Sequence, residues 1–329
     1  MNQVQVTILT DPMPWAREFF LETTRRVARK LRNIFFNSKQ IKGSRYRGHF
    51  AVTRSLVEGL KEISVKCNYN PYHPGELADV VIVLAGVRTL RQAIRLKQRG
   101  KIKKLYAGPN IVTFASDFNF IVASPEVDYY ILNSDWTLKL YNHDCPALEG
   151  RCVIWPAGVD VGYWTPNTKR VRGDILIYDK LEDDKRGQIT QYAGYLRGLG
   201  WIVRVIQYGA FSHGEYLKML QGASLMLGFS ACESQGIAWA EAWSCDVPTL
   251  ILKNTVKVDL GRRFECSTAP YLKEQNGLFF ENMEDFKSKF SYWENHREKF
   301  TPRKWVLENM SDQVCAGLLH QHIVATANK

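Results

Sequence analysis

Two glutamates, Glu233 and Glu241, lie in a stretch whose other residues are mostly apolar or small, FSACESQGIAWAEAWSCDVPTLIL (residues 229–252). An apolar run leads into a short loop, a helix-like segment follows, and a second apolar run closes the stretch. Burying a carboxylate is unfavourable unless a partner compensates for its lost hydration. A carboxylate on such a helix can accept two hydrogen bonds from a diol such as a ribose. The pattern therefore indicates a polar ligand site, with Glu233 reaching hydroxyl groups and Glu241 holding a diol.

The loop before this helix has features of an anion-binding turn. Gly236 allows the backbone to approach a ligand closely, and the small Ser234 leaves room beside Gln235. The first N–H groups of a helix have no partner inside the helix, so they favour a negatively charged ligand. We therefore expect Ser234, Gln235 and Gly236 to contact the substrate.

Strand-like and helix-like segments alternate along the whole chain, which predicts parallel sheets with crossover helices. A segment rich in Pro, Gly and charge at 162–173 separates two such series. We therefore predict an α/β protein with two doubly wound Rossmann-like domains facing each other across a cleft. The expected strands are residues 4–10, 64–70, 78–86, 103–110, 127–133, 151–160, 174–180, 201–209, 224–231 and 249–252.

Several motifs together resemble those of a known enzyme family. ESQGIAWAEAWSCDVPTL resembles the donor-site signature of retaining GT-B glycosyltransferases, the group 1 type that uses nucleotide sugars. YDKLEDDKRG resembles the loop that holds the donor diphosphate, with Lys180 and Lys185 where the family has Arg and Lys. WPAGVDVGYWTP resembles the domain junction, and residues 303–323 resemble a closing helix that crosses back to the first domain. The likeness covers most of residues 129–323, whereas the first half matches only in the order of its elements.

This resemblance implies the GT-B fold and sugar transfer with retention of anomeric configuration, without a metal or other cofactor. It implies an acceptor-side domain at 1–165, a nucleotide-sugar domain at 166–300 and a closing helix in 301–329. The first glutamate of the signature lies beside the donor sugar and the second binds the ribose, roles that fall to Glu233 and Glu241. The candidate catalytic residues are thus Glu233, Lys180 and Lys185.

The chain also departs from the family pattern. Gln235 replaces an aromatic residue, and Lys180 keeps a charge but lacks the bidentate fork of Arg. Asp246 stands where the family has a glycine after the helix, and Asp tolerates the left-handed conformation that this turn requires. In the first half, Gly108 and Asn110 end a predicted strand, where they either line the cleft or form an ordinary turn.

The overall charge favours an anionic partner, because the formal net charge is +11. Nine cations lie between Arg25 and Arg47 without an intervening acid. They form either a solvated face or, with the aromatic residues of the preceding segment, an amphipathic helix that binds an anionic membrane. Seven cysteines at irregular spacing indicate a reducing compartment. We therefore expect a cytoplasmic protein, with the inner membrane face as a further expected partner.

The predicted function is transfer of a sugar from a nucleotide sugar to a glycan, lipid-linked or small-molecule acceptor, in the setting of cell-surface glycan or glycolipid synthesis. Three alternatives stay open at this stage. The first is another GT-B activity, namely a nucleotide-sugar epimerase or an inverting transferase. The second is a nucleic-acid-binding protein that uses the basic segment, although the charge clusters far from the glutamate loop. The third is a catalytically inactive partner subunit.

Overall fold

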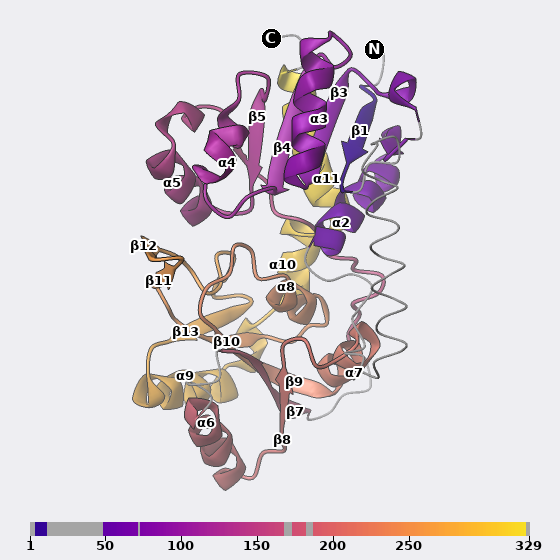
Figure 1. The fold of residues 1–329 in the computed structure, drawn as a ribbon. Coiled ribbons are helices and arrows are strands. Elements are labelled where there is room, and N and C mark those ends of the chain that lie inside the picture. The colour runs from indigo at the N-terminus through magenta and orange to yellow at the C-terminus, as the bar shows by residue number, and fades with distance from the viewer. Residues whose placement is uncertain (1–3, 12–48, 72, 168–172, 182–186, 327–329) are drawn as a thin grey trace, which may run out of the picture. The chain divides into compact units, whose positions relative to one another are not determined.

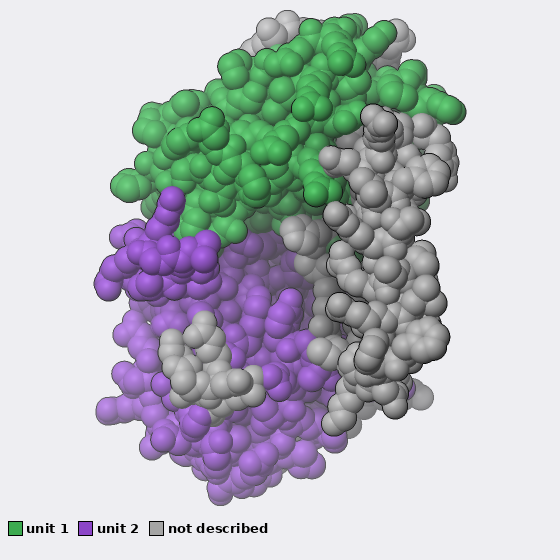
Figure 2. Space-filling model, in the orientation of Figure 1, with its two compact units in different colours: residues 1–41, 45–158, 315–329 green, residues 42–44, 159–314 purple. Residues whose placement is uncertain are grey.

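A computed structural model describes residues 4–11, 49–71, 73–167, 173–181 and 187–326. The basic segment Arg25–Arg47 and Lys185 lie outside the described residues, so the expectations about them are not addressed by the structure. Among the described residues the chain divides into two compact units (Figure 2). Unit 1 contains the chain up to Gly158 and again from Cys315, and unit 2 contains Val159–Val314.

Unit 1 is built on a parallel sheet with strand order β2-β1-β3-β4-β5-β6, counted over the described residues (Figure 1). All but the last residue of β3 are fully buried, as expected for a parallel strand covered on both faces. Figure 1 shows α3 on one face of the sheet and α11 on the other. The elements of unit 1 are β1 (Val6–Leu9), α2 (His49–Glu62), β2 (Cys67–Tyr69), β3 (Val80–Ala85), α3 (Val87–Gln98), β4 (Lys104–Asn110), α4 (Asp117–Phe120), β5 (Tyr129–Leu132), α5 (Asp135–Asp144), β6 (Cys152–Ile154) and most of α11 (Asp312–Thr326).

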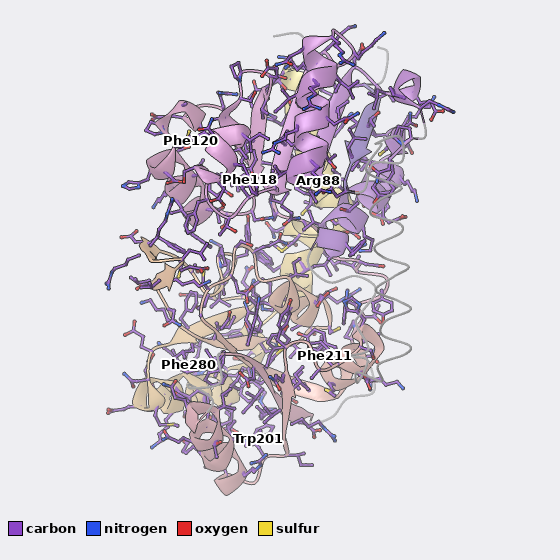
Figure 3. All side chains as sticks on the ribbon, in the orientation of Figure 1. Arg88, Phe118, Phe120, Trp201, Phe211 and Phe280 are labelled. Carbon is purple, nitrogen blue, oxygen red and sulfur yellow. The ribbon has the colours of Figure 1, made fainter. Side chains whose placement is uncertain are left out.

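Unit 2 has a second parallel sheet, with strand order β13-β10-β9-β7-β8 in the described part of the chain. Its core is rich in aromatic side chains, including Trp201 and Phe280, which are labelled in Figure 3. Many of their rings meet at an angle, the arrangement that aromatic pairs favour. The elements of unit 2 are β7 (Asp174–Lys180), α6 (Gly187–Gly198), β8 (Val203–Gln207), α7 (His213–Gly222), β9 (Ala223–Ser230), α8 (Ile237–Ser244), β10 (Thr249–Leu252), β11 (Val256–Asp259), β12 (Arg262–Glu265), β13 (Gly277–Phe280), α9 (Met283–Asn295) and α10 (Pro302–Asn309).

The expected strands are present, although β6 ends at Ile154, six residues before the predicted end of that strand, and three further features differ from the sequence-based expectation. An antiparallel hairpin, β11–β12, and a further parallel strand, β13, follow β10. The units divide at Gly158, not at residue 165, and the region expected to be one closing helix contains two. The closing region is interrupted because Ser311 accepts a hydrogen bond from Val314 N (3.2 Å) and so begins a new helix. Main-chain bonds from Val159 N to Met310 O and from Asp312 N to Val159 O hold this break.

Arg303, the second residue of α10, fixes the end of helix α8 within unit 2. Its guanidinium donates to the carbonyl of Ser244, the last residue of α8, and to the carbonyls of Trp164 (3.0 Å) and Val161 (3.2 Å). The last carbonyls of a helix have no partner inside the helix, and a cation is favourable there. The planar guanidinium reaches these three carbonyls from two separate nitrogens, a spread of donors that the single nitrogen of an ammonium group does not have.

We predict that Arg303→Lys lowers the free energy of unfolding by at least about 2 kcal/mol, because hydrogen bonds to charged groups contribute about 1.5–3 kcal/mol each. Urea unfolding followed by tryptophan fluorescence measures this change. Lys304→Gln removes a neighbouring exposed cation from the same helix and serves as the control, with an expected change below about 0.5 kcal/mol. Equal stability of the two variants would show that Arg303 does not fix α8.

Candidate functional site

The candidate site of unit 2 lies where the order of its strands reverses. β7 is the first strand of this sheet, and β8 and β9, the next two in the chain, lie on opposite sides of it. In open α/β sheets, ligands bind outside the carboxyl ends of the strands at such a switch point. The parallel register pairs Lys180 with Ser230, the last residues of β7 and β9. Two residues fifty positions apart are therefore neighbours at this edge.

Glu233 is held by side chains from both strands. Lys180 Nζ and Ser230 Oγ each lie 2.8 Å from Glu233 Oε1, and the Glu233 N–H donates to Ser267 O at 2.8 Å. The Glu233 side chain is only 13% exposed, whereas that of Lys180 is 32% exposed and also lies over the Tyr208 ring. Lys180 has three N–H donors and uses one on Glu233, so the remaining donors can bind a phosphate oxygen.

Gly236 sets the turn between Glu233 and α8. Its φ of +81° is left-handed, and it is the residue that immediately precedes the helix. An added Cβ would lie 2.2 Å from Trp239 Cδ1, so a side chain has no room there. Trp239 is itself fixed, since its Nε1 donates to Thr268 O at 2.9 Å. The turn predicted from Gly236 is thus imposed both by backbone conformation and by contact with a buried indole.

Gln235 is buried and Ser234 is exposed in this loop, so of the predicted contact residues Ser234 faces solvent. The left-handed turn expected at Asp246, just after α8, is confirmed by its φ of +59°.

Glu241 is 8% exposed on α8. The pKa of Tyr163 is raised by burial and by the nearby carboxylates of Glu241 and Asp160. The pKa of Tyr216 is raised well above its ordinary value by burial, then by Tyr178 and Glu241. The Glu241 carboxylate is therefore within electrostatic reach of the side chains of Tyr163 and Tyr216.

Unit 1 carries Gly108 and Asn110 on β4. Gly108 has a φ of +103°, and an added Cβ would lie 2.3 Å from Ile131 O of the neighbouring β5. The close approach of β4 and β5 thus explains why this position is a glycine. Asn110 is different, because its Nδ2 is buried without a hydrogen-bond partner among the described residues.

A polar group at the switch point of unit 1 escaped the sequence reasoning. β1 and β3 are adjacent where the strand order of this sheet reverses. Asp11 follows β1 and accepts a hydrogen bond from Thr89 Oγ1 of α3. Gly86 packs against the Asp11 carboxyl group, and its N–H donates to Asn110 O (3.3 Å). The signal in the sequence was the presence of Asp11 and Gly86 just after two strands that are neighbours in the predicted parallel sheet.

His320 and His322 do not form a metal site with other described residues. No group of three or more His, Cys, Asp or Glu side chains in the described ranges has the arrangement of metal ligands. Burial lowers the pKa of both imidazoles, and the His322 ring packs edge-on against Tyr129 at 4.8 Å between centroids.

No helix in the described part of the chain has the length and apolar character needed to cross a membrane.

Comparison with known proteins identifies the fold. No protein-family model matches the sequence, and no curated protein matches it. The lipopolysaccharide outer core galactosyltransferase WaaB, apo form, is similar over 99% of this chain and 100% of its own, with a TM-score of 0.57 and 11% identity. Sucrose-phosphate synthase from Thermosynechococcus elongatus matches over 98% and 100%, with a TM-score of 0.51 and 10% identity.

A chain of the GtfA/B complex has a TM-score of 0.56 and 13% identity, over 77% of this chain. This chain spans only 58% of the length of that relative. At such low identity the likeness concerns the fold alone. These structures are GT-B proteins, and the predicted GT-B fold with two Rossmann-like units is therefore confirmed.

We predict that Gly236→Ala destabilises the protein more than Gly261→Ala does. Both glycines are left-handed, with φ of +81° and +75°, but an added Cβ at Gly261 meets nothing within 4 Å. Left-handed strain costs each variant about 1–2 kcal/mol, and overlap with Trp239 adds about 1–3 kcal/mol at Gly236. Urea unfolding of the two variants isolates the overlap as their difference. Identical losses would mean that Trp239 yields freely and does not fix the turn.

Proposed function

From the GT-B fold as premise, we propose that this chain is a glycosyltransferase that moves a sugar from a nucleotide sugar to an acceptor with retention of anomeric configuration. The observation that carries the proposal is the Lys180–Glu233–Ser230 cluster at the carboxyl edge of β7 and β9, directly before helix α8. It joins an acid, a cation and a helix start at the place where an open α/β sheet binds its ligand.

The proposed roles follow from the chemistry of each group. Departure of the nucleotide puts negative charge on its diphosphate, and Lys180 together with the first N–H groups of α8 stabilises that charge. Glu233 lies beside the donor sugar, where its carboxylate faces the developing positive charge of the ring. Glu241 accepts hydrogen bonds from the ribose diol. These groups supply charge compensation from the protein itself, so we propose that the reaction requires no metal ion.

The acceptor and setting are proposed more broadly. We propose a glycan or lipid-linked acceptor in cell-surface glycan synthesis, a setting supported by the end-to-end likeness to the galactosyltransferase WaaB. The membrane-surface partner is likewise a proposal, supported by the net charge of +11 and the nine cations between Arg25 and Arg47.

A two-stage experiment tests this function. Thermal-shift screening with UDP-, GDP-, ADP- and CMP-sugars identifies the donor, and proton NMR of the reaction with EDTA present follows the anomeric configuration of the product. We expect one donor to stabilise the protein and its configuration to be kept. Inversion at the anomeric carbon would support an inverting transferase, and conversion of the free donor into its epimer would support an epimerase.

We predict that Lys180→Gln weakens binding of the matching nucleoside diphosphate about ten-fold, since a charge-assisted contact is worth roughly 1.4 kcal/mol or more. Binding of the bare nucleoside should be unchanged, because it carries no phosphate. Calorimetry with both ligands makes the comparison. Lys253→Gln is the matched control, because Lys253 follows β10 at the same sheet and also pairs with a glutamate, Glu281 at 2.7 Å. A loss of nucleoside affinity equal to the loss of diphosphate affinity would assign Lys180 a structural role.

We predict that Glu241→Gln weakens the nucleoside and the nucleoside diphosphate by the same factor, about ten-fold. Gln keeps the shape of the side chain but offers one acceptor oxygen instead of two, so a diol loses half of its paired contact. The 2′,3′-dideoxynucleoside is the control ligand and should bind the variant and the wild type equally. Unchanged affinity for the ordinary nucleoside would contradict the ribose assignment.

A further inference from the structure

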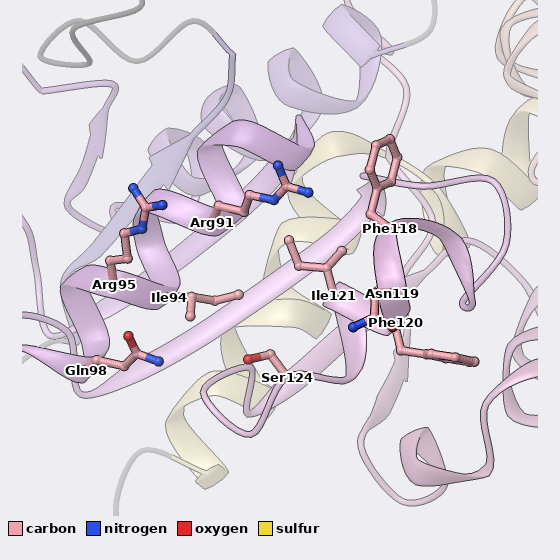
Figure 4. Close-up of a pocket in the computed structure, with 9 residues that line it drawn as sticks. All are labelled: Arg91, Ile94, Arg95, Gln98, Phe118, Asn119, Phe120, Ile121 and Ser124. Carbon is pink, nitrogen blue, oxygen red and sulfur yellow. The ribbon is translucent and has the colours of Figure 1, made fainter.

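A pocket in unit 1 lies apart from the switch-point residues of that unit. It has a volume of about 410 Å³ and lies between α3 and the segment that follows β4 (Figure 4). Ile94 and Ile121 form its apolar floor, while polar and aromatic side chains surround it in Figure 4. The lining residues are Arg91, Ile94, Arg95, Gln98, Phe118, Asn119, Phe120, Ile121 and Ser124. A concave site with an apolar floor and a few polar groups on its rim is typical of small-ligand binding.

One wall of the pocket is a strained backbone segment. Phe118, Asn119 and Phe120 are consecutive left-handed residues, with φ of 52°, 59° and 55°. Each such residue costs roughly 1–2 kcal/mol relative to the right-handed conformation. The strain does not bury the two aromatic rings, since Phe118 is 59% exposed and Phe120 is 44% exposed. Because these exposed rings add nothing to the hydrophobic core, packing does not account for the strained backbone, and a function at this segment is indicated.

Hydrogen bonds just before the strained segment keep it in place. Asp117 Oδ2 accepts from the N–H groups of Thr113 (3.0 Å) and Phe114 (2.9 Å). Ser116 donates from both its N–H and its hydroxyl to Asp144 Oδ2, each at 2.8 Å. The surrounding structure therefore determines the conformation that presents Phe118 and Phe120.

The opposite wall carries two cations. Arg91 and Arg95 are one turn apart on α3, an arrangement that destabilises a helix by like-charge repulsion. Neither guanidinium forms an ion pair or a side-chain hydrogen bond within the described part of the chain. Arg91 lies over the Phe118 ring, with its Cζ 5.9 Å from the ring centroid. The wall thus offers unused N–H donors in the forked geometry that suits carboxylate, sulfate or phosphate groups.

At the far end of the pocket, the lining residues Gln98 and Ser124 are hydrogen-bonded to Glu126, which lies outside the lining. Gln98 Nε2 donates to Glu126 Oε1 (2.8 Å), and Ser124 Oγ donates to the same carboxyl group. The hydrogen bond from Ser124, and to a smaller extent that from Gln98, lowers the pKa of Glu126, which therefore stays ionised. A ligand matching this pocket places its anionic group at Arg91 and Arg95 and neutral hydroxyls near Gln98 and Ser124.

We propose that this pocket binds an acidic sugar chain, with a carboxylate, sulfate or phosphate on Arg91 and Arg95 and a sugar ring against Phe118. The inference rests on the proposed function, since a glycosyltransferase has reason to hold a glycan on the unit that lacks the donor-site glutamates. A sugar ring combines an apolar face with hydroxyls, which suits an aromatic wall, an aliphatic floor and a polar far end. A flat anionic membrane fits less well, because the site is concave.

Calorimetry on the full chain at about 0.1 M salt tests the proposal with tetragalacturonate as the acidic probe and maltotetraose as the neutral one. We expect tetragalacturonate to bind at least ten-fold more tightly than maltotetraose. The double variant Arg91→Gln/Arg95→Gln should lose at least ten-fold in affinity for tetragalacturonate. The matched control Arg99→Gln/Lys101→Gln removes the same net charge from exposed positions outside the pocket and should lose less than two-fold. Phe118→Asn, which tolerates the left-handed conformation, should lose at least three-fold.

Several results would overturn the proposal. Equal losses in the two double variants would show unspecific attraction by charge. Inorganic phosphate bound as tightly as tetragalacturonate would show a simple anion site. Sedimentation with phosphatidylglycerol vesicles that depends on Arg91, Arg95 and Phe118, without any binding of tetragalacturonate, would show a membrane contact instead.

The donor screen with nucleotide sugars is run on the same samples and separates this inference from the proposed function. Tetragalacturonate binding that depends on Arg91 and Arg95, without binding of any nucleotide sugar, would support the pocket and refute the transferase. Nucleotide-sugar binding without tetragalacturonate binding would refute the pocket alone.

Discussion

The parallel pairing of β7 with β9 is the constraint on which the candidate site depends. It places Lys180 opposite Ser230, and the loop that leaves β9 then turns Glu233 back onto both side chains. A shift of register by one residue would point Lys180 to the opposite face of the sheet and leave Glu233 without its cation. The buried apolar residues on both sides of each strand oppose such a shift, so the hydrophobic core of unit 2 also fixes the geometry of its charged edge.

Helix α8 links this edge to the rest of unit 2. Its start is set by the left-handed turn at Gly236 and by Trp239, and its last carbonyl is held by Arg303 of α10. The helix therefore cannot slide along its axis without breaking contacts at both ends. Glu241 lies between these two anchors, so a nearly buried carboxylate has a fixed position on the helix, within electrostatic reach of Tyr163 and Tyr216. Fixed dipoles and charges of this kind need little reorganisation when a ligand binds.

Unit 1 repeats the topology but carries different chemistry. Its switch point holds Asp11 and Thr89, and nearby the Asn110 amide has no partner among the described residues. Elsewhere on unit 1, two arginines without an ion pair in the described ranges line a pocket together with exposed aromatic rings. Left-handed backbone occurs beside these polar groups, at Gly86 and Gly108 without strain and at the three non-glycine residues 118–120 with strain. The conformation of Gly108 follows from the packing of β4 against β5, whereas the strained residues 118–120 mark a place where unit 1 departs from the demands of packing alone.

The sequence by itself determined the class of fold, because apolar runs and helical periodicity are local properties of the chain. It also identified the glutamate loop and the turns at Gly236 and Asp246, since residue type alone decides which positions tolerate a left-handed backbone. The tertiary structure decided the rest. The ion pair of Lys180 with Glu233, the group around Asp11, and the pocket between Arg91 and Phe118 join residues 27 to 78 positions apart. Strand order and crossover packing bring such residues together, and neither is encoded in any short stretch of sequence.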